Sequence, residues 1–313
     1  MVFKFFFILI IFGWGFSYNT RYGSELYQDG KNARNSALGG VSMSYADGSN
    51  PVLLKNKKIP SIHFSHKNKF GGLVQITILS YFHPGKKHPV YIGLTNRLVN
   101  NIPDTRLAWV DNGNFFPESG EIDYFNIHEI DQQEIGIQLS TIRLWGPYTL
   151  GFNIKPSFTI LAESISYGIN FDVATMLQLI DKLDVMLRME DIIGLEYWDS
   201  GTVETISPMI MGGMNYHLSN LRLGLEIGSR IESKAPLHYH MGIEYEQQDQ
   251  LSFRLGTSHS NQFTAGFGIQ LSLVDFNYAY LHPDQGSPFE GSHIISTGIN
   301  LDKLNWIKGE MAP

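Results

Sequence analysis

Apolar and polar side chains alternate along most of this chain with a period of two residues, which is the repeat of a β-strand. The clearest stretch is LRLGLEIGSR at 221–230, where every second residue from Leu221 to Ile227 is apolar. The same alternation recurs in four later stretches, at 237–246, 250–258, 262–272 and 274–281. The pattern predicts an all-β fold.

The alternation predicts about fourteen strands, most of them near the ~9–11 residues that a tilted strand needs to cross a bilayer. They exceed the ~5–6 residues usual in globular proteins. One of them, 183–190, is also compatible with a helix. The predicted strands are 61–67, 72–82, 89–98, 134–144, 148–158, 165–174, 183–190, 207–218, 221–230, 237–246, 250–258, 262–272, 274–281 and 293–301.

The connections between these strands alternate in length. Short ones follow the even strands, at 83–88, 145–147, 175–182, 219–220, 247–249 and 273, whereas every long one follows an odd strand, at 99–133, 191–206 and 282–292. Outer-membrane barrels have short periplasmic turns and longer outer loops. We therefore expect a transmembrane up-and-down antiparallel β-barrel with both termini in the periplasm.

The N-terminus predicts export. Residues 1–17 combine Lys4, the apolar run FFFILIIF at 5–12, and the small residues Gly15 and Ser17, as a signal peptide does. The run is too short for a membrane-spanning helix. We expect residues 18–60 to enter the barrel or cover its periplasmic mouth as a plug, 61–301 to form the barrel, and 302–313 to lie outside it.

Composition agrees with a barrel in the bacterial outer membrane. The chain is 13% aromatic and only 17% charged, with 31 glycines and no cysteine. No later segment is apolar enough for a transmembrane helix, but barrel strands alternate and so have ordinary mean hydropathy. The formal net charge of −7 comes with no basic run, which argues against nucleic acid. The expected surroundings are the lipid bilayer, with its phospholipid and lipopolysaccharide.

Charged residues gather on the polar faces of the last strands, where a barrel has its lumen. Opposite charges on neighbouring strands can pair, so the favoured interpretation is an ordinary polar lining. A polar conduit or ligand site is the alternative. The candidate lumen residues are Arg222, Glu226, Arg230, His238, His240, Glu244, Arg254 and Asp275.

Catalytic and metal signatures are weak. His238, His240 and Glu244 share one strand face, but their spacing supplies no further ligand for zinc. The chain has no Gly-x-Ser-x-Gly elbow, no His-Glu-x-x-His and no phosphate-binding glycine loop. We therefore predict no enzyme, no metal and no cofactor.

The long loop at 99–133 is rich in aromatic residues set among acidic ones. Exposed aromatic side chains are typical of protein-contact surfaces. A loop that folds inward and closes the pore is the alternative. The candidate partner-binding residues are Trp109, Phe115, Phe116, Tyr124 and Phe125.

Three segments carry a family resemblance. NARNSALGGVSMSYADGSNPVLL at 32–54 resembles the opening of PorV/PorQ-like outer-membrane proteins, and NIPDT at 101–105 is similar to their first outer loop. The strongest likeness is C-terminal, in MGIEYEQQDQLSFRLG, FTAGFGIQ and FNYAYLHPDQG, which begin at 241, 263 and 276. The resemblance implies a fourteen-stranded barrel related to the long-chain fatty-acid transporters.

The resemblance also implies a role. PorV/PorQ-like proteins include members that bind and shuttle secreted proteins in type IX secretion, so secretion-system or cargo proteins are expected partners. The alternative is a fatty-acid-transporter-like channel for apolar small molecules, in which 18–60 would be a movable plug. A third possibility is a soluble periplasmic β-protein, whose apolar faces would pack against one another.

Overall fold

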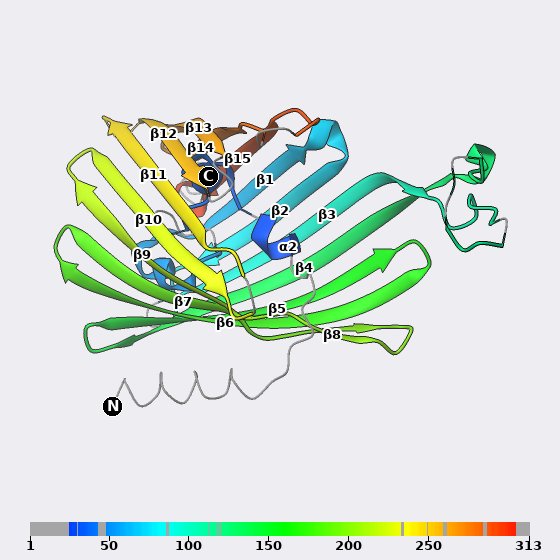
Figure 1. Ribbon diagram of the computed structural model, residues 1–313. Coiled ribbons are helices and arrows are strands. Elements are labelled where there is room, and N and C mark those ends of the chain that lie inside the picture. Colours follow the sequence, from blue (N-terminus) through cyan, green and yellow to red (C-terminus); the bar gives the residue numbers. More distant parts are fainter. Residues whose placement is uncertain are drawn as a thin grey trace, which may run out of the picture.

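The computed structural model describes residues 25–29, 31–42, 48–85, 88–111, 113–116, 118, 120–232, 235–248, 250–258, 262–283 and 287–304. Within them, fourteen strands pair antiparallel with their neighbours and close into a barrel (Figure 1). β1 pairs with β15, and β6 pairs with β7. The predicted signal peptide, 1–17, lies outside the described residues.

The strands are β1 (Ser61–Lys69), β2 (Val74–His83), β3 (Val90–Asp104), β4 (His128–Trp145), β5 (Tyr148–Leu161), β6 (Ser164–Ile180), β7 (Leu183–Trp198), β9 (Met209–Leu218), β10 (Leu221–Arg230), β11 (His238–Gln247), β12 (Leu251–Ser258), β13 (Phe263–Gln270), β14 (Val274–Leu281) and β15 (Ser292–Asn300). A short β8 (Val203–Thr205) pairs only with the end of β7.

The predicted barrel is confirmed, and so is the strand at 183–190. Four strands are at least five residues longer than predicted. β3 and β4 continue pairing up to Asp104 and His128, which shortens the predicted loop 99–133 to 105–127. β6 runs to Ile180, and β7 runs to Trp198 through the first half of the segment 191–206, which the sequence predicts as loop.

The wall has an apolar exterior and a polar interior. On β10, Leu223, Leu225 and Ile227 are 38%, 37% and 48% exposed, whereas Glu226 between them is fully buried. A row of exposed apolar side chains around a closed sheet is what a lipid-facing surface requires. The apolar faces therefore do not pack against a second sheet, as a soluble sandwich would need.

One strand departs from this rule. On β2, Val74, Ile76 and Ile78 are buried, and Ile76 lies between Lys67 of β1 and Arg97 of β3, both of which are buried polar residues. The apolar side chains in the first half of β2 thus face inward, whereas Leu79 and Tyr81 in its second half are 50% and 38% exposed on the outside.

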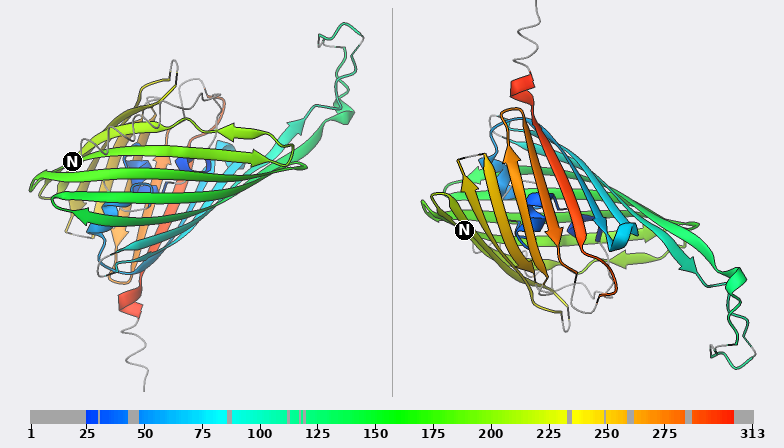
Figure 2. Two further views of the ribbon diagram at one scale, coloured as in Figure 1. Left: turned by 90° about the horizontal axis from the view of Figure 1, so that it is seen from below. Right: turned by 90° about the horizontal axis from the view of Figure 1, so that it is seen from above.

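The two ends of the barrel differ. One end carries tight turns, such as 146–147, 181–182 and 219–220, and the other carries the 105–127 segment and the 282–291 loop (Figure 2). By the rule for outer-membrane barrels, the tight turns are periplasmic. Leu301–Leu304 form a helical turn beyond β15 at the tight-turn end. Among the described residues, no helix is both long and apolar enough to span a membrane.

Candidate functional site

The N-terminal segment lies inside the barrel and is called the plug below, for its described residues 25–29, 31–42 and 48–56. It contains α2 (Glu25–Asp29), α3 (Ala33–Ala37) and the 3₁₀ helix η1 (Pro51–Asn56). α3 contacts β12 to β15, and η1 contacts β4 to β6 on the opposite side. Side-chain caps start both later helices: Asn32 accepts from the Asn35 amide at 2.9 Å, and Asn50 accepts from the Val52 amide at 3.4 Å.

Glycines of the late strands make room for the plug. A Cβ at Gly256 would lie 2.2 Å from the Gly39 nitrogen, and a Cβ at Gly242 would lie 2.7 Å from the Leu38 oxygen. Thr264 completes this seat, because its hydroxyl accepts from the Gly39 amide and donates to the Ala37 carbonyl, both at 2.9 Å. The glycines allow backbone to approach backbone.

A buried carboxylate joins the plug to the wall. Glu244 of β11 accepts two hydrogen bonds from Arg34 of α3, at 2.8 and 2.5 Å, and one from Arg254 of β12 at 2.6 Å. Arg222 of β10 lies 3.4 Å away. Glu244 is 1% exposed, so its charge depends on these guanidinium partners. Arg34 and Glu244 lie 210 positions apart in the sequence, and the fold brings their segments into contact.

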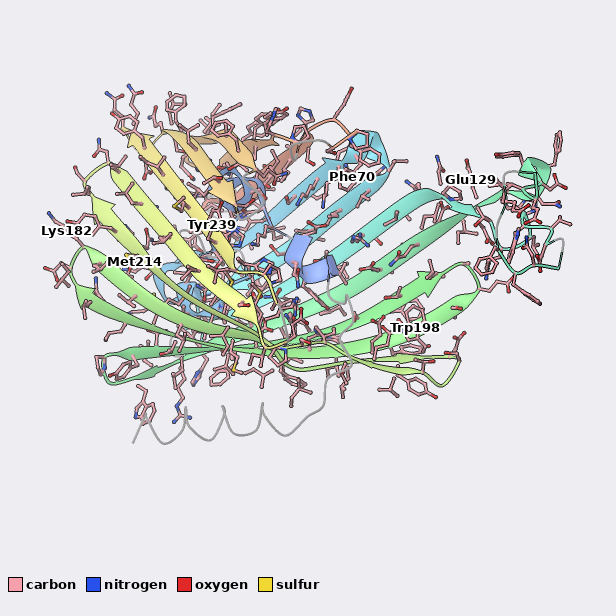
Figure 3. The ribbon with its side chains drawn as sticks, viewed as in Figure 1. Phe70, Glu129, Lys182, Trp198, Met214 and Tyr239 are labelled. Carbon is pink, nitrogen blue, oxygen red and sulfur yellow. The ribbon has the colours of Figure 1, made fainter. Side chains whose placement is uncertain are left out.

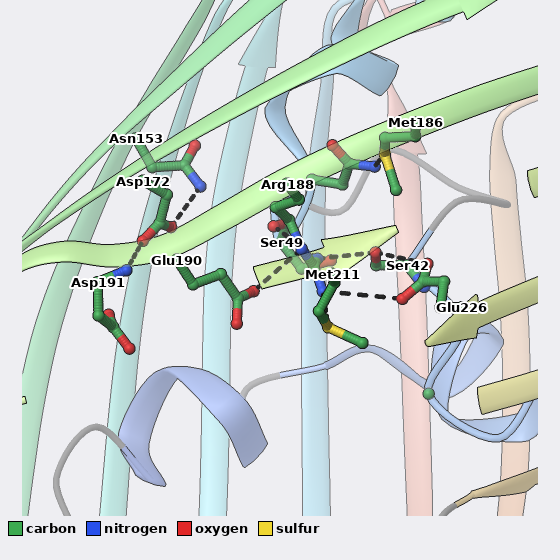
Figure 4. Close-up of polar contacts among 12 residues, drawn as sticks. Ser42, Ser49, Asn153, Asp172, Met186, Arg188, Glu190, Asp191, Met211 and Glu226 are labelled. Atoms are coloured by element: carbon green, nitrogen blue, oxygen red, sulfur yellow. Dashed lines mark hydrogen bonds and ion pairs between the residues drawn. The ribbon is translucent and has the colours of Figure 1, made fainter. Parts of the chain in front are cut away.

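A second contact between plug and wall centres on Arg188 of β7 (Figure 4). Its guanidinium donates to the Ser42 hydroxyl at 2.7 Å and to the Ser49 carbonyl at 3.3 Å. Ser42 in turn donates its amide and hydroxyl hydrogens to Glu226 of β10, at 2.7 and 2.8 Å. Glu190 lies 3.3 Å from Arg188. The plug thus bridges charged residues of two strands.

Salt bridges attach the helix α2 to β1. Asp29 lies 3.4 Å from Lys67 and 2.8 Å from Lys69, both on β1. Burial alone would raise the pKa of Asp29, but the two lysines outweigh burial and hold the pKa of this carboxyl well below its ordinary range. Burial raises the pKa of Tyr27, so its hydroxyl keeps the proton that it donates.

Tyr27 reaches a break in the wall. The register of β4 and β5 has no pairs between Gly136↔Ser157 and Leu139↔Ile154, where Pro156 supplies no N–H. The Tyr27 hydroxyl lies 2.6 Å from the Pro156 carbonyl oxygen and 3.3 Å from that of Ile137. A Cβ at Gly136 would lie 2.5 Å from this hydroxyl.

A bulge in β7 brings a further carboxylate inward. The register between β6 and β7 shifts at Asp191, whose φ is 51°, a left-handed conformation that is rare for residues other than glycine. Asp191 then lies 3.1 Å from Lys155, which is also 2.8 Å from Asp172. Asn170 donates to Asp191 at 2.8 Å. Lys155 is thus shared between two aspartates in this part of the lumen.

The remaining predicted lumen residues also lie inside. Arg230 donates to the Ser207 carbonyl at 2.5 Å and lies 3.8 Å from Asp191. His240 contacts the Gly39 carbonyl at 2.7 Å, which leaves it turned toward the plug and away from a site shared with Glu244. Asp275 accepts from Asn277 at 2.9 Å. His238 lines the larger cavity described below. The described residues hold no cluster suited to a metal ion.

Sequence reasoning missed several buried charged residues that line the lumen on the strands from β1 to β7. Lys155 and Asp172 occupy the polar positions of predicted strands, so the alternation that identified Glu226 and Glu244 could also have identified them. Asp191 lacked such a signal, because its position falls on the lipid-facing side of the alternation. The missed residues are Lys67, Arg97, Glu134, Lys155, Asp172, Arg188 and Asp191.

The described residues line two sizeable cavities beside the plug. The larger, of about 330 Å³, is lined by charged residues that include Lys155, Asp172 and Arg230. The smaller, of about 280 Å³, combines Leu26, Leu161, Trp198 and Ile206 with carboxylates and Arg97. Tyr27 lines both cavities. The helix α2 therefore forms a partition between them.

The five predicted partner-binding residues lie far from this interior. Trp109, Phe115, Phe116, Tyr124 and Phe125 all belong to the 105–127 segment, which projects beyond the barrel at the extended ends of β3 and β4 (Figures 1 and 2). The segment does not fold into the pore. An inward-folded closing loop is therefore not what this part of the chain forms.

A closed barrel with a lipid-facing exterior, a charged lumen and an internal plug is a transmembrane β-barrel of the bacterial outer membrane. Among solved structures, the chain is similar to the toluene transporter TodX of Pseudomonas putida, with a TM-score of 0.60 and 12% identity over 87% of this chain and 98% of TodX. It is also similar to CymD, a monoaromatic hydrocarbon channel, with a TM-score of 0.55 and 11% identity over 90% and 97% of the two chains.

At this level of identity the likeness establishes the barrel fold alone. No family model matches the sequence. No curated protein matches it either.

Proposed function

We propose that this protein is an outer-membrane channel for small apolar molecules, of the chemical class of monoaromatic hydrocarbons. The observation that carries the proposal is the fourteen-stranded barrel, whose likeness to TodX and CymD extends over nearly the whole of those two chains. The plug inside the lumen is consistent with a channel that admits selected solutes, because it divides the interior into two cavities.

The strand pairing of the wall supports a route that leaves the lumen sideways. Lys155, Asp172 and Arg188 line the larger cavity, and their desolvation would oppose an apolar solute there. The smaller cavity lies beside α2, and its wall combines Leu26, Leu161, Trp198 and Ile206 with Arg97 and three glutamates. The break at Pro156 is the part of the nearby wall where strand pairing is missing. An apolar solute could pass from this cavity toward lipid there.

Uptake of radiolabelled toluene tests the proposal in cells that lack their own hydrocarbon channels. We expect uptake to rise on expression of this chain and to fall again in Pro156→Val, which returns an N–H to the gap. Ser157→Ala is a neighbouring control that leaves Pro156 in place. Toluene uptake equal to that of cells carrying an unrelated barrel would refute the channel function.

We also propose, as a second candidate, that the chain binds or shuttles secreted proteins in type IX secretion. The supporting observation is that Arg34 and Glu244, from the two most distant segments of the PorV/PorQ-like resemblance, form one buried ion pair. Pull-down of secreted β-sandwich sorting domains tests this role. We expect enrichment that is lost on deletion of 106–126, and no enrichment over an unrelated barrel would exclude it.

A further inference from the structure

The described residues of the 105–127 segment form a hairpin that stands clear of the barrel. β3 and β4 extend past their neighbours to carry it, and the views agree that it lies beyond the wall (Figures 1 and 2). Glu129 lies on this extension (Figure 3). A segment in that position neither lines the lumen nor covers the lipid-facing wall, so its surface needs another explanation.

Internal hydrogen bonds hold the hairpin in shape. Trp109 and Ile122 form a β-bridge, and the Val110 amide donates to the Glu121 carbonyl at 2.9 Å. The Trp109 indole donates to the Glu121 carboxylate at 3.1 Å, and Ala108 beside it is fully buried. A surface ordered before binding loses less conformational entropy when a partner arrives.

The ordered hairpin presents large aromatic side chains to water. Phe115, Phe116, Tyr124 and Phe125 are 80%, 73%, 73% and 95% exposed. Phe115 has a φ of 59°, a left-handed conformation that is strained for a phenylalanine. Such residues are enriched in the cores of protein interfaces. Their exposure at an ordered tip indicates a surface that a partner covers.

The charge of the hairpin selects the kind of partner. Residues 105–127 contain four carboxylates and one basic residue, Arg106. Arg106 is bound through two nitrogens to Asp104, at 2.9 and 2.7 Å, so its charge is already matched. Glu129 and Asp131 extend the acidic surface along β4. Phosphate-bearing lipopolysaccharide would be repelled by this surface, whereas a cationic one would be attracted.

We propose that the hairpin is a docking site for a protein that presents a basic surface with an apolar pocket for its aromatic tip. This inference does not depend on either proposed function. Toluene uptake concerns the lumen and the wall, and the type IX role specifies sorting domains. The channel function can therefore fail separately. Capture of a protein with a sorting domain would support the type IX role as well, whereas capture of any other protein would support the docking site alone.

Photo-crosslinking in cells tests the docking site. A benzophenone amino acid replaces Phe116 in the full chain, and the same replacement at Leu223, on the lipid-facing wall, serves as the control. We expect a protein adduct from position 116 alone. The captured protein is then purified and its affinity for the full chain in nanodiscs is measured at low and high salt.

Reversing the charge of the hairpin tests whether the captured protein binds through a basic surface. Glu118→Lys combined with Glu129→Lys should weaken binding of the captured protein by about tenfold or more, and added salt should weaken binding to the unmodified chain. Heat-modifiable gel mobility checks that the double variant still forms the barrel. An adduct with lipopolysaccharide, an adduct with a second copy of this chain, a protein whose binding ignores the charge reversal, or no adduct would each overturn the proposal.

Discussion

The hydroxyl of Tyr27 lies 2.6 Å from the carbonyl oxygen of Pro156, a residue 129 positions further along the chain. The contact joins α2 of the plug to the one interruption in the β4–β5 pairing of the described wall. Proline creates the gap because it has no N–H, and the tyrosine brings a donor to the carbonyls that the gap leaves. The position of the plug and the integrity of the wall are therefore coupled.

Tyr27→Phe tests this coupling. The change removes only the hydroxyl, so it should lower the free energy of unfolding by about 1 kcal/mol. Urea denaturation in detergent measures this loss. We also expect toluene uptake to increase, because the gap at Pro156 loses its cover. Unchanged uptake and unchanged stability together would show that the hydroxyl does not secure the gap.

Gly256→Val should displace the plug. Its Cβ would lie 2.2 Å from the Gly39 nitrogen, and backbone on both sides leaves no flexible side chain to yield. The chain has no cysteine, so Ala37→Cys, at a fully buried position, supplies a unique thiol. We expect a water-soluble maleimide to label this thiol at least about tenfold faster when Gly256→Val is present, because a released helix exposes it.

Gly212→Val is the matched control for that labelling. No atom lies within 4 Å of a Cβ at Gly212, so its substitution should leave labelling of Ala37→Cys slow. Equal labelling rates in the Gly256 and Gly212 variants would show that close approach to the late strands does not hold the plug.

Removing the charge of Glu244 should cost more stability than removing that of Arg34. Glu244→Gln leaves the Arg34 and Arg254 guanidinium groups without their shared carboxylate, and loss of one partner of a buried pair typically costs about 3–5 kcal/mol. Arg34→Met leaves Glu244 paired with Arg254. Urea denaturation of the two variants measures the difference, and a larger loss in Arg34→Met would contradict this account.

Asp29 should make the stability that the plug contributes depend on pH in the acid range. Its pKa is lower in the folded state than in the unfolded state, so its contribution is fully present above the unfolded value of about 3.9 and is lost as pH falls toward the folded value. We expect the stability difference between the native chain and Asp29→Asn to be constant near neutral pH and to shrink below about pH 4. A difference that grows on acidification would reverse the sign and exclude this explanation.

Period-two alternation predicted the barrel because lipid outside and polar groups inside impose it on every strand that crosses the membrane. Strand ends were harder to predict. β4 begins at His128, where the sequence HEIDQQ is too polar to look membrane-spanning, because this part of β4 pairs with β3 toward the 105–127 hairpin. β7 continues past Asp191 because a bulge turns that carboxylate inward toward Lys155. The bulge is a local change of backbone conformation, and the alternation of apolar and polar residues does not predict it.

The lumen could be predicted as a set of polar faces but not as a set of partners. Glu226 and Glu244 were identifiable on the inner faces of their strands. Their contacts with Ser42 and Arg34 depend on how the plug is placed, and no local pattern determines that placement. The apolar inner residues of β2, such as Ile76, were misjudged because alternation shows that two faces differ without showing which face is inside.

The plug is synthesised before the strands that hold it. The Ala33 amide donates to the Ser296 hydroxyl of β15, across 263 positions, and β15 also closes the barrel against β1. The seat of α3 is therefore complete only when the last strand is in place. Closure of the wall at β15 and retention of this helix thus depend on the same strand.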